Sequence, residues 1–266
     1  MCVITVSGGW ARGGQLFAEG LARRLRFRAI DSEHIIRSAA EAGAPEEDLR
    51  RALEKPPPLI DRLVTHKKYL YMAHLQAALA EAVKDGKTIY YGYAGHLLLS
   101  GAGPVLCIRI IADEELRLRT LEEDRGMARE EALAYVERVD LERKRWSHYL
   151  YGVDWEDPKL YDIVLNIGHI LEISDACDVV TTLARNHRCF EMTSERHAEL
   201  RDYALGCRVR ARLAAEAPYA NFHVSKISAR RGTVRVESSL DEAEQITTIE
   251  RIVKSVEGVR ELDLKY

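Results

Sequence analysis

The sequence lacks three features that often reveal a protein's class: paired cysteines, a long apolar segment and an excess of one charge. Its five cysteines are scattered without a C-x-x-C pair, so neither a disulfide framework nor a zinc site is indicated. The longest apolar stretch, residues 97–112, contains glycine, proline and Arg109, and the apolar N-terminal run is too short for a signal peptide, so we expect no membrane span. The formal net charge is -3, which predicts no general attraction to nucleic acid. We therefore expect a cytoplasmic protein with reduced thiols.

Motifs of metal-dependent and serine hydrolases are also missing. The sequence contains no H-E-x-x-H and no G-x-S-x-G, and His66 and His74 are too far apart to form a metal pair on one helical turn. We therefore predict no metal-binding residues and disfavour both a hydrolase and a metalloenzyme.

Short β-branched or aromatic runs alternate with segments of helical periodicity, which predicts an α/β fold with a parallel sheet flanked by helices. The runs lie at residues 2–6, 88–91, 105–111 and 163–167. Asp113 and Ser174 are placed to cap helices, and Asp85-Gly86 is placed to close a long one. Pro56-Pro57-Pro58 breaks a helical stretch.

After about residue 188 the pattern restarts as a smaller α+β unit. Its predicted elements are one helix, a strand pair around residues 221–238, a helix from Asp241 and a final strand near residues 259–264. We predict one domain over residues 1–187 and a second over residues 197–266, joined within residues 185–197. Because each part has its own apolar faces, we expect a cut near Ser194 to give two soluble pieces.

A glycine-rich stretch, "SGGWARGGQ", follows the first strand. Gly8, Gly9, Gly13 and Gly14 are suited to a loop whose backbone N–H groups hold phosphate at a helix N-terminus. The full G-x-x-x-x-G-K-[ST] signature also requires a lysine and a hydroxyl, but here Gly14 and Gln15 stand in those places. Taken alone, the stretch therefore fits either a phosphate-binding loop or a strand-turn-helix of no chemical role.

Two further stretches carry a resemblance to a known family. The segment "AIDSEHIIR" is similar to the D-x-x-x-x-x-R of cytidylate kinases, and "DLERKRWSHYLYGVDWEDPKLYDIVLN" is similar to the family's D-x-x-R followed by G-x-D-x-x-D-P-x-L-Y-D-L-V-L-N. With the glycine-rich loop, these motifs resemble the cytidylate kinase-like family of P-loop nucleoside-monophosphate kinases over about residues 1 to 186. In that family Gly13-Gly14 without a lysine is usual, but Gly8, Gly9, Ala11 and Gln15 depart from the family's Arg, Glu, Gly and Arg. The resemblance implies a P-loop kinase-like fold that transfers the γ-phosphoryl of ATP to a nucleoside monophosphate, CMP by default, with ATP and Mg²⁺.

The resemblance also implies roles for single residues. Asp31 and Arg37 match the acid and arginine that hold the monophosphate substrate. Asp140 and Arg143 match the lid over the transferring phosphate, and Arg117 matches an arginine beside the ATP base and phosphates. A solvated helix face is the alternative for each arginine, and a helix cap is the alternative for Asp31.

The sequence departs from the family where positive charge is expected. After the strand at residues 88–91 the family usually has an arginine that grips the substrate phosphate, and this sequence has Tyr93 there. Tyrosine donates one hydrogen bond but provides no cationic fork. Arg12, or an arginine from elsewhere in the fold, would have to replace the missing charge. We therefore expect the loop to bind phosphate through its backbone N–H groups and any kinase activity to be reduced.

Residues 197–266 resemble a BON domain in the helix "ELRDYALGCRVRARL", in a strand pair around Gly232 and in the final "GVRELDLKY". The resemblance implies a non-catalytic unit that binds a lipid or another small ligand. The arginines of this unit form either a basic patch or, by preference, a surface mixed with nearby acids. The alternative for the whole protein is therefore a non-catalytic, nucleotide- or ligand-responsive sensing or scaffold protein.

Overall fold

The computed structural model describes residues 3–54, 66–103, 105–168, 171–186 and 191–265. Its larger part is built on a five-stranded parallel sheet with the order β2-β3-β1-β4-β5. The strands are β1 (Val3–Gly8), β2 (Arg28–Asp31), β3 (Thr88–Tyr91), β4 (Val105–Ala112) and β5 (Ile163–Ile167). The predicted α/β fold with a parallel sheet is confirmed. The first strand ends later than predicted because Ser7 and Gly8 still pair with Arg109 and Ile110 of β4.

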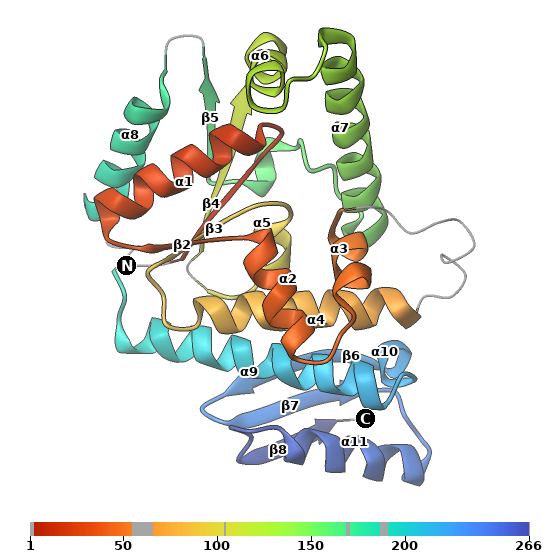
Figure 1. Ribbon diagram of the computed structural model, residues 1–266. Helices are drawn as coiled ribbons and strands as arrows, with labels where there is room; N and C mark the ends of the chain where they lie inside the picture. Colours follow the sequence, from red (N-terminus) through yellow and green to blue (C-terminus); the bar gives the residue numbers. More distant parts are fainter. Residues whose placement is uncertain (1–2, 55–65, 104, 169–170, 187–190, 266) are drawn as a thin grey trace.

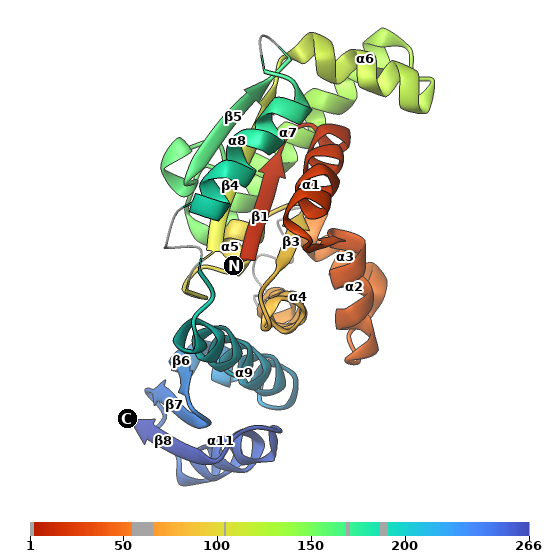
Figure 2. The same cartoon turned by 90° about the vertical axis from the view of Figure 1, so that its left-hand side faces the viewer.

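Helices cover both faces of this sheet (Figures 1 and 2). They are α1 (Ala11–Leu25), α2 (Ser32–Glu41), α3 (Glu46–Glu54), α4 (His66–Val83), α5 (Gly95–Leu98), α6 (Glu114–Arg125), α7 (Arg129–Tyr151), the 3₁₀ turn η1 (Pro158–Leu160) and α8 (Ile173–Asn186). On one face, Phe17 of α1 and Val180 of α8 pack against Ile4 of β1. The helices α2, α3, α4 and α5 contribute to the apolar cluster on the other face.

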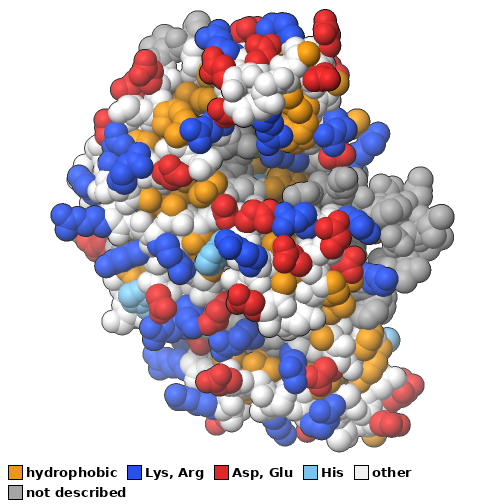
Figure 3. Space-filling view, in the orientation of Figure 1, with side chains coloured by type: hydrophobic (Ala, Val, Ile, Leu, Met, Phe, Trp, Pro, Cys, Tyr) orange, Lys and Arg blue, Asp and Glu red, His pale blue; other side chains and the backbone are white. Residues whose placement is uncertain are grey.

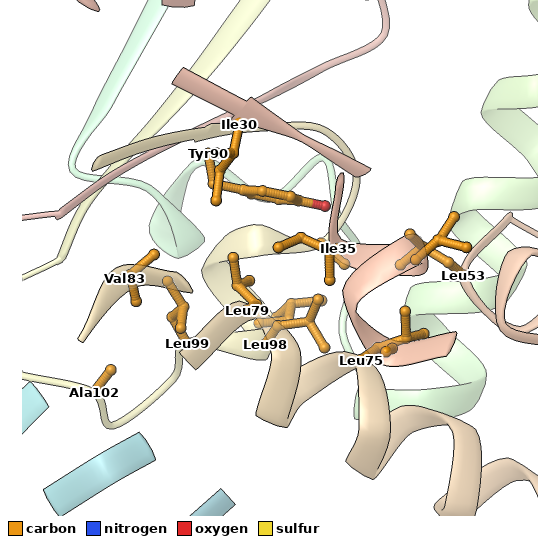
Figure 4. Close-up of a cluster of buried hydrophobic side chains, with 14 of the residues drawn as sticks. Ile30, Ile35, Leu53, Leu75, Leu79, Val83, Tyr90, Leu98, Leu99 and Ala102 are labelled. Atoms are coloured by element: carbon orange, nitrogen blue, oxygen red, sulfur yellow. The ribbon is translucent and has the colours of Figure 1, made fainter. Parts of the chain in front are cut away.

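That second cluster includes Tyr90 of β3 and is drawn in Figure 4. Tyr90 and Ile30 lie above Ile35 of α2, and Leu79 of α4 and Leu98 of α5 complete the cluster below them. Tyr90 is fully buried, and its hydroxyl donates to the carbonyl oxygen of Tyr93 at 3.0 Å. The cluster therefore fixes the segment that follows β3, where Tyr93 lies.

The predicted helix ends are partly confirmed. Asp113 caps α6, because its carboxylate accepts a hydrogen bond from the Leu116 amide at 2.7 Å. The prediction for Ser174 is wrong, since α8 already begins at Ile173 and the Ser174 hydroxyl instead accepts from Arg24 of α1 at 3.0 Å. The turn at Gly86 follows the end of α4, with φ of +71°. The segment Pro56-Pro57-Pro58 lies outside the described residues.

A second, three-stranded sheet with the order β6-β7-β8 forms the C-terminal unit. Its elements are α9 (Ser194–Glu216), α10 (Ala220–His223), β6 (Val224–Arg230), β7 (Thr233–Ser238), α11 (Ala243–Ser255) and β8 (Glu261–Lys265). The strands β6 and β7 are antiparallel around a turn at Arg231 and Gly232, where both residues have positive φ, and β8 runs parallel to β7. The last helix begins at Ala243 rather than at Asp241. The residue before it, Glu242, provides no side-chain cap for its N-terminus.

Helix α9 belongs to both parts of the molecule (Figure 2). One side of α9 places Leu205, Val209 and Leu213 in the core of the C-terminal unit. Another side places Ala204 against Ala80 of α4, and a second alanine cluster lies along the same contact. The junction therefore differs from a simple linker, because α9 packs between the two sheets.

The surface of the C-terminal unit carries charges of both signs, as Figure 3 shows for one face. Arg208 pairs with Glu81 at 3.0 Å and Arg235 pairs with Asp263 at 2.7 Å. The mixed surface preferred from the sequence fits these pairs better than a basic patch. Among the described residues, no helix is long and apolar enough to cross a membrane.

Candidate active site

The connection between β1 and α1 is shorter than the predicted loop. Helix α1 begins at Ala11, and the Gly14 amide donates to the Trp10 carbonyl at 3.0 Å as the first hydrogen bond of the helix. Gly13 therefore lies in the first helical turn, where a Cβ atom would meet the Trp10 ring at 1.9 Å. The glycine at position 13 makes room for an aromatic side chain, a role that the sequence pattern did not reveal.

Trp10 fills the corner between the turn and α6. Its side chain is 8% exposed, and its Nε1–H donates to the Thr120 hydroxyl at 3.1 Å. Sequence reasoning missed Trp10, although a large aromatic residue between two glycine pairs was a visible signal. A cavity of about 90 Å³ remains beside it, lined in part by Gly9, Arg117 and Arg143.

The N-terminal end of α1 is electrostatically suited to an anion. Trp10 provides no side-chain cap, and the first turn contains no acidic residue. The first N–H groups of the helix therefore have no intrahelical partner or side-chain cap. Arg12 lies at this end and faces Asp124 at 3.7 Å, while the Gln15 amide donates to Glu19 at 2.9 Å.

Arg117 of α6 lies against the turn and is held by Asp140 of α7. The guanidinium makes two parallel hydrogen bonds to the Asp140 carboxylate, at 2.7 and 2.9 Å. A Cβ atom on Gly9 would come within 3.1 Å of the Arg117 guanidinium carbon, so this glycine permits the close approach. The structure thus brings together predicted residues from the turn and from two helices.

Arg143 of α7 reaches the same turn. Its guanidinium donates to the Gly8 carbonyl at 2.6 Å and lies over the rings of Tyr93 and Trp155, at 5.5 and 5.6 Å from their centroids. Burial lowers the pKa of Arg143. The Tyr93 hydroxyl donates to the Arg143 carbonyl at 2.6 Å, so Tyr93 holds α7 in place. Burial also raises the pKa of Tyr93.

Asp31 and Arg37 lie on the neighbouring element. Asp31 ends β2 and caps α2, because its carboxylate accepts from the His34 amide at 2.8 Å. Arg37 is exposed on α2, and it adds to the lowering of the Glu33 pKa that arises first from the hydrogen bond with Arg50. A substrate role for Asp31 and Arg37 stays a prediction.

A second group of polar side chains lies beside Arg143 and was not singled out from the sequence. Arg109 of β4 is 8% exposed, and its guanidinium lies over Trp155, 4.8 Å from the ring centroid. His96 of α5 is 7% exposed, with its Nδ1 3.4 Å from the Ser7 hydroxyl. Burial and the nearby Arg109 lower the pKa of His96 to about 4, so this histidine is neutral at neutral pH. An arginine in the middle of an apolar strand was the signal that the sequence offered.

Larger cavities lie elsewhere. One of about 790 Å³ lies between α2, α4 and α9, and another of about 850 Å³ lies between α9, β6 and the segment after α5. In the described part of the chain, no group of three or more His, Cys, Asp or Glu side chains is arranged to hold a metal ion.

The strand order of the parallel sheet switches direction at β1, and arginines gather at the carboxyl end of the sheet. This arrangement is that of a P-loop kinase-type nucleotide-binding fold. The chain matches the sequence profile of the cytidylate kinase-like family over residues 3–169. A cytidylate kinase of Pyrobaculum neutrophilum is 32% identical over 180 residues, which cover 66% of this chain and 89% of that protein. A cytidylate kinase of Thermococcus kodakarensis is 30% identical over 169 residues, which cover 63% of this chain and 80% of that protein.

A solved structure, an uncharacterized protein from Eubacterium ventriosum, shares the fold with a TM-score of 0.52 at 16% identity, covering 70% of this chain and 99% of that one. The chain therefore belongs to the cytidylate kinase-like family, and its relatives support an ATP-dependent nucleotide kinase. The family match ends at residue 169, before α8 and the C-terminal unit.

Proposed function

We propose that this chain transfers the γ-phosphoryl group of ATP to a nucleoside monophosphate, with CMP as the first candidate, at the carboxyl ends of β1 and β4. One observation carries the proposal: Arg143 and Arg117 approach the β1–α1 turn from two different helices, Arg143 donating to the Gly8 carbonyl at the end of β1 and Arg117 lying where a side chain on Gly9 would be. Two cations at an uncapped helix N-terminus form a surrounding suited to phosphate groups.

The reaction needs positive charge more than covalent help. An oxygen of the acceptor phosphate forms a bond to the γ-phosphorus while the bond from that phosphorus to the leaving ADP oxygen breaks. We assign Arg143 to the transferring group, because its guanidinium donates to the Gly8 carbonyl where β1 enters the turn. Asp140 would orient Arg117 toward the nucleotide phosphates. Arg12 is a weaker candidate, since it faces Asp124 across a half-exposed surface.

The residues present suit the phosphates of ATP better than they suit a metal held by protein ligands. Gln15 stands where a hydroxyl is usual, and its amide is already bonded to Glu19. Magnesium commonly binds through substrate phosphates and one or two carboxylates. We therefore propose that Mg²⁺ arrives with ATP. Without a lysine in the turn, we propose a lower turnover than in relatives that have one.

A second function is kept because two observations favour it. Trp10 packs into the turn, and two cavities much larger than the one at the turn adjoin α9. In this alternative the chain is a nucleotide- or ligand-responsive scaffold without catalysis. The C-terminal unit, proposed as a BON-like domain of residues 197–266 from its helix-strand-strand-helix-strand order, would then bind a lipid or small ligand.

Calorimetric titration with ATP, followed by a coupled ADP-release assay over several nucleoside monophosphates, separates the two functions. For the kinase, Arg143→Ala should lower kcat by about 10² to 10³, the usual loss of one transition-state donor. Arg145→Ala, an exposed arginine on the same helix, is the matched control and should leave kcat unchanged. ATP binding without ADP release from any monophosphate would instead favour the scaffold.

A further inference from the structure

We propose that Arg109, with His96 and Trp155, forms the subsite that takes the phosphate of the acceptor nucleotide and replaces the arginine absent at position 93. The proposal rests on the proposed function, since it names how the same site recognises its acceptor. Its ligand is a dianionic phosphate group carried by a nucleoside.

The first argument is position. Ile4 and Val6 of β1, and Ile108 and Ile110 of β4, pack on the side of α1 and α8. Because strand side chains alternate between faces, Ser7 and Arg109 point to the opposite face, and they are direct neighbours in the sheet. Ser7 immediately precedes Gly8, whose carbonyl binds Arg143. Arg109 therefore lies on the sheet face next to the turn and under α7.

The second argument is that three buried N–H groups lack a hydrogen-bond acceptor. Within the described structure, His96 Nε2, Arg109 Nε and Trp155 Nε1 are buried and have no hydrogen-bond partner. All three side chains are more than nine-tenths buried. Ser7 can donate to His96 Nδ1, which leaves the proton of the neutral ring on Nε2 as a donor. A buried donor without a partner is unfavourable, so the grouping of these three calls for an acceptor.

The third argument is charge. Arg109 and Arg143 both lie over the Trp155 ring, at 4.8 and 5.6 Å from its centroid. Arg109 has one carboxylate partner, the half-exposed Glu156 at 3.4 Å. Arg143 makes no ion pair within 4.0 Å among the described residues, since the Asp140 carboxylate is engaged by Arg117. One buried and one half-buried cation with so few acidic partners favour an anion between them.

The fourth argument explains the tyrosine. The Tyr93 hydroxyl is used by the Arg143 carbonyl, and its ring packs edge-on against Trp146 at 4.8 Å. Tyr93 thus holds α7 in place, and a guanidinium for the phosphate has to come from another strand. The Arg109 guanidinium donates through one terminal nitrogen to the Glu156 carbonyl and through the other to the half-exposed Glu156 carboxylate at 3.4 Å, so a phosphate would bind at the buried Nε–H and displace the carboxylate contact. The charge missing at position 93 is therefore supplied from position 109.

The test compares Arg109→Met with Arg145→Met, an exposed arginine of α7 that serves as the control. CMP binding is measured by calorimetry, and KM for CMP, KM for ATP and kcat are measured in the ADP-release assay. We expect Arg109→Met to raise Kd and KM for CMP roughly 10- to 100-fold, the loss of a charge-assisted hydrogen bond, with KM for ATP nearly unchanged. Arg109→Lys keeps the charge and should restore part of the affinity, and it serves as the readout if the methionine variant does not fold.

The outcomes separate this subsite from the proposed function. If the parent binds CMP without releasing ADP, and Arg109→Met weakens that binding, the subsite stands and the kinase function fails. If the parent turns CMP over and Arg109→Met leaves both constants for CMP unchanged, the subsite is overturned and the function stands. A parent that binds no monophosphate also overturns the subsite.

Discussion

Small residues shape two regions of this molecule, the β1–α1 turn and the contact of α4 with α9. At the turn they make room for large side chains, and at the contact they let two helices pack closely. At the turn, glycines admit large groups: the Trp10 ring lies where a Cβ of Gly13 would be, and the Arg117 guanidinium lies over Gly9. The remaining hollow measures about 90 Å³. Along α9, alanines let two helices approach, and cavities of about 790 and 850 Å³ remain beside the contact.

The comparison shows that the volume of a cavity and the polar groups that line a site are separate indicators of function. The paired and buried arginines, the neutral histidine and the uncapped helix end all lie at the tightly packed turn, while the large cavities lie beside a seam of alanines. A phosphate site requires converging donors more than it requires space, because its ligand group is small and strongly charged. For this fold, the donors are the better guide to function.

The largest loss of stability is expected from a substitution in the alanine contact between α4 and α9, which we call the seam. Ala204→Asp would place a carboxylate in the dry contact with Ala80 and Cys207, and it should lower the free energy of unfolding by about 3–5 kcal/mol. Ala215→Asp, at an exposed position in the last turn of the same helix, is the control and should cost only about 1 kcal/mol, from helix propensity and the helix dipole. Urea denaturation measures both.

The same experiment sharpens the predicted domain division. If α9 couples the two parts, the parent unfolds in one transition and Ala204→Asp splits it into two. Two transitions in the parent would favour the prediction that a cut near Ser194 gives two independently stable pieces. Equal stability of Ala204→Asp and the parent would contradict close packing at the seam.

The next effect is a dependence of stability on pH at the turn. The pKa of His96 is about 4 in the folded chain and about 6.5 in an unfolded one, so the unfolded chain binds the extra proton first as the pH falls. Stability should therefore decrease between pH 6.5 and 4, by up to about 3 kcal/mol from this group. In His96→Gln that portion of the decrease should vanish.

Burial also lowers the pKa of His74, so the parent will keep some pH dependence from a second source. The comparison of parent and His96→Gln isolates the portion from His96, and His148→Gln on the exposed side of α7 controls for the loss of a histidine. A slope between pH 6.5 and 4 that is identical in parent and His96→Gln would mean that the ring is charged or solvated in the folded chain.

A smaller effect distinguishes the two glycines inside α1. Gly13→Ala forces a Cβ into the Trp10 ring and should destabilise the chain by about 1–3 kcal/mol. Gly14→Ala meets nothing within 4 Å and should stabilise the helix by up to about 1 kcal/mol. In a Trp10→Ala background the cost of Gly13→Ala should disappear. Equal effects of the two alanines in the parent would show that Trp10 does not occupy the turn.

The sequence predicted the parallel sheet and several helix positions because strand runs and helical periodicity are local signals. It also indicated the family, since "DLERKRWSHYLYGVDWEDPKLYDIVLN" is a long motif. It did not predict the short turn, because whether Gly13 and Gly14 lie in a loop or in a helix depends on where Trp10 packs. The role of Arg109 was equally hidden, since an arginine within a strand acquires meaning only from its neighbours on other elements.

The smallest expected effect decides between two roles of Asp31. As a cap of α2 it accepts from the His34 amide, which asparagine does about equally well, so Asp31→Asn should change stability by less than about 0.5 kcal/mol, whereas Asp31→Ala should cost about 1 kcal/mol. If Asp31 also binds the acceptor, Asp31→Asn raises KM for CMP while stability is kept, because the amide retains the acceptor oxygen but not the charge. If KM for CMP is unchanged in Asp31→Asn and changes only in Asp31→Ala, where stability is also lost, then capping α2 is the only role of Asp31.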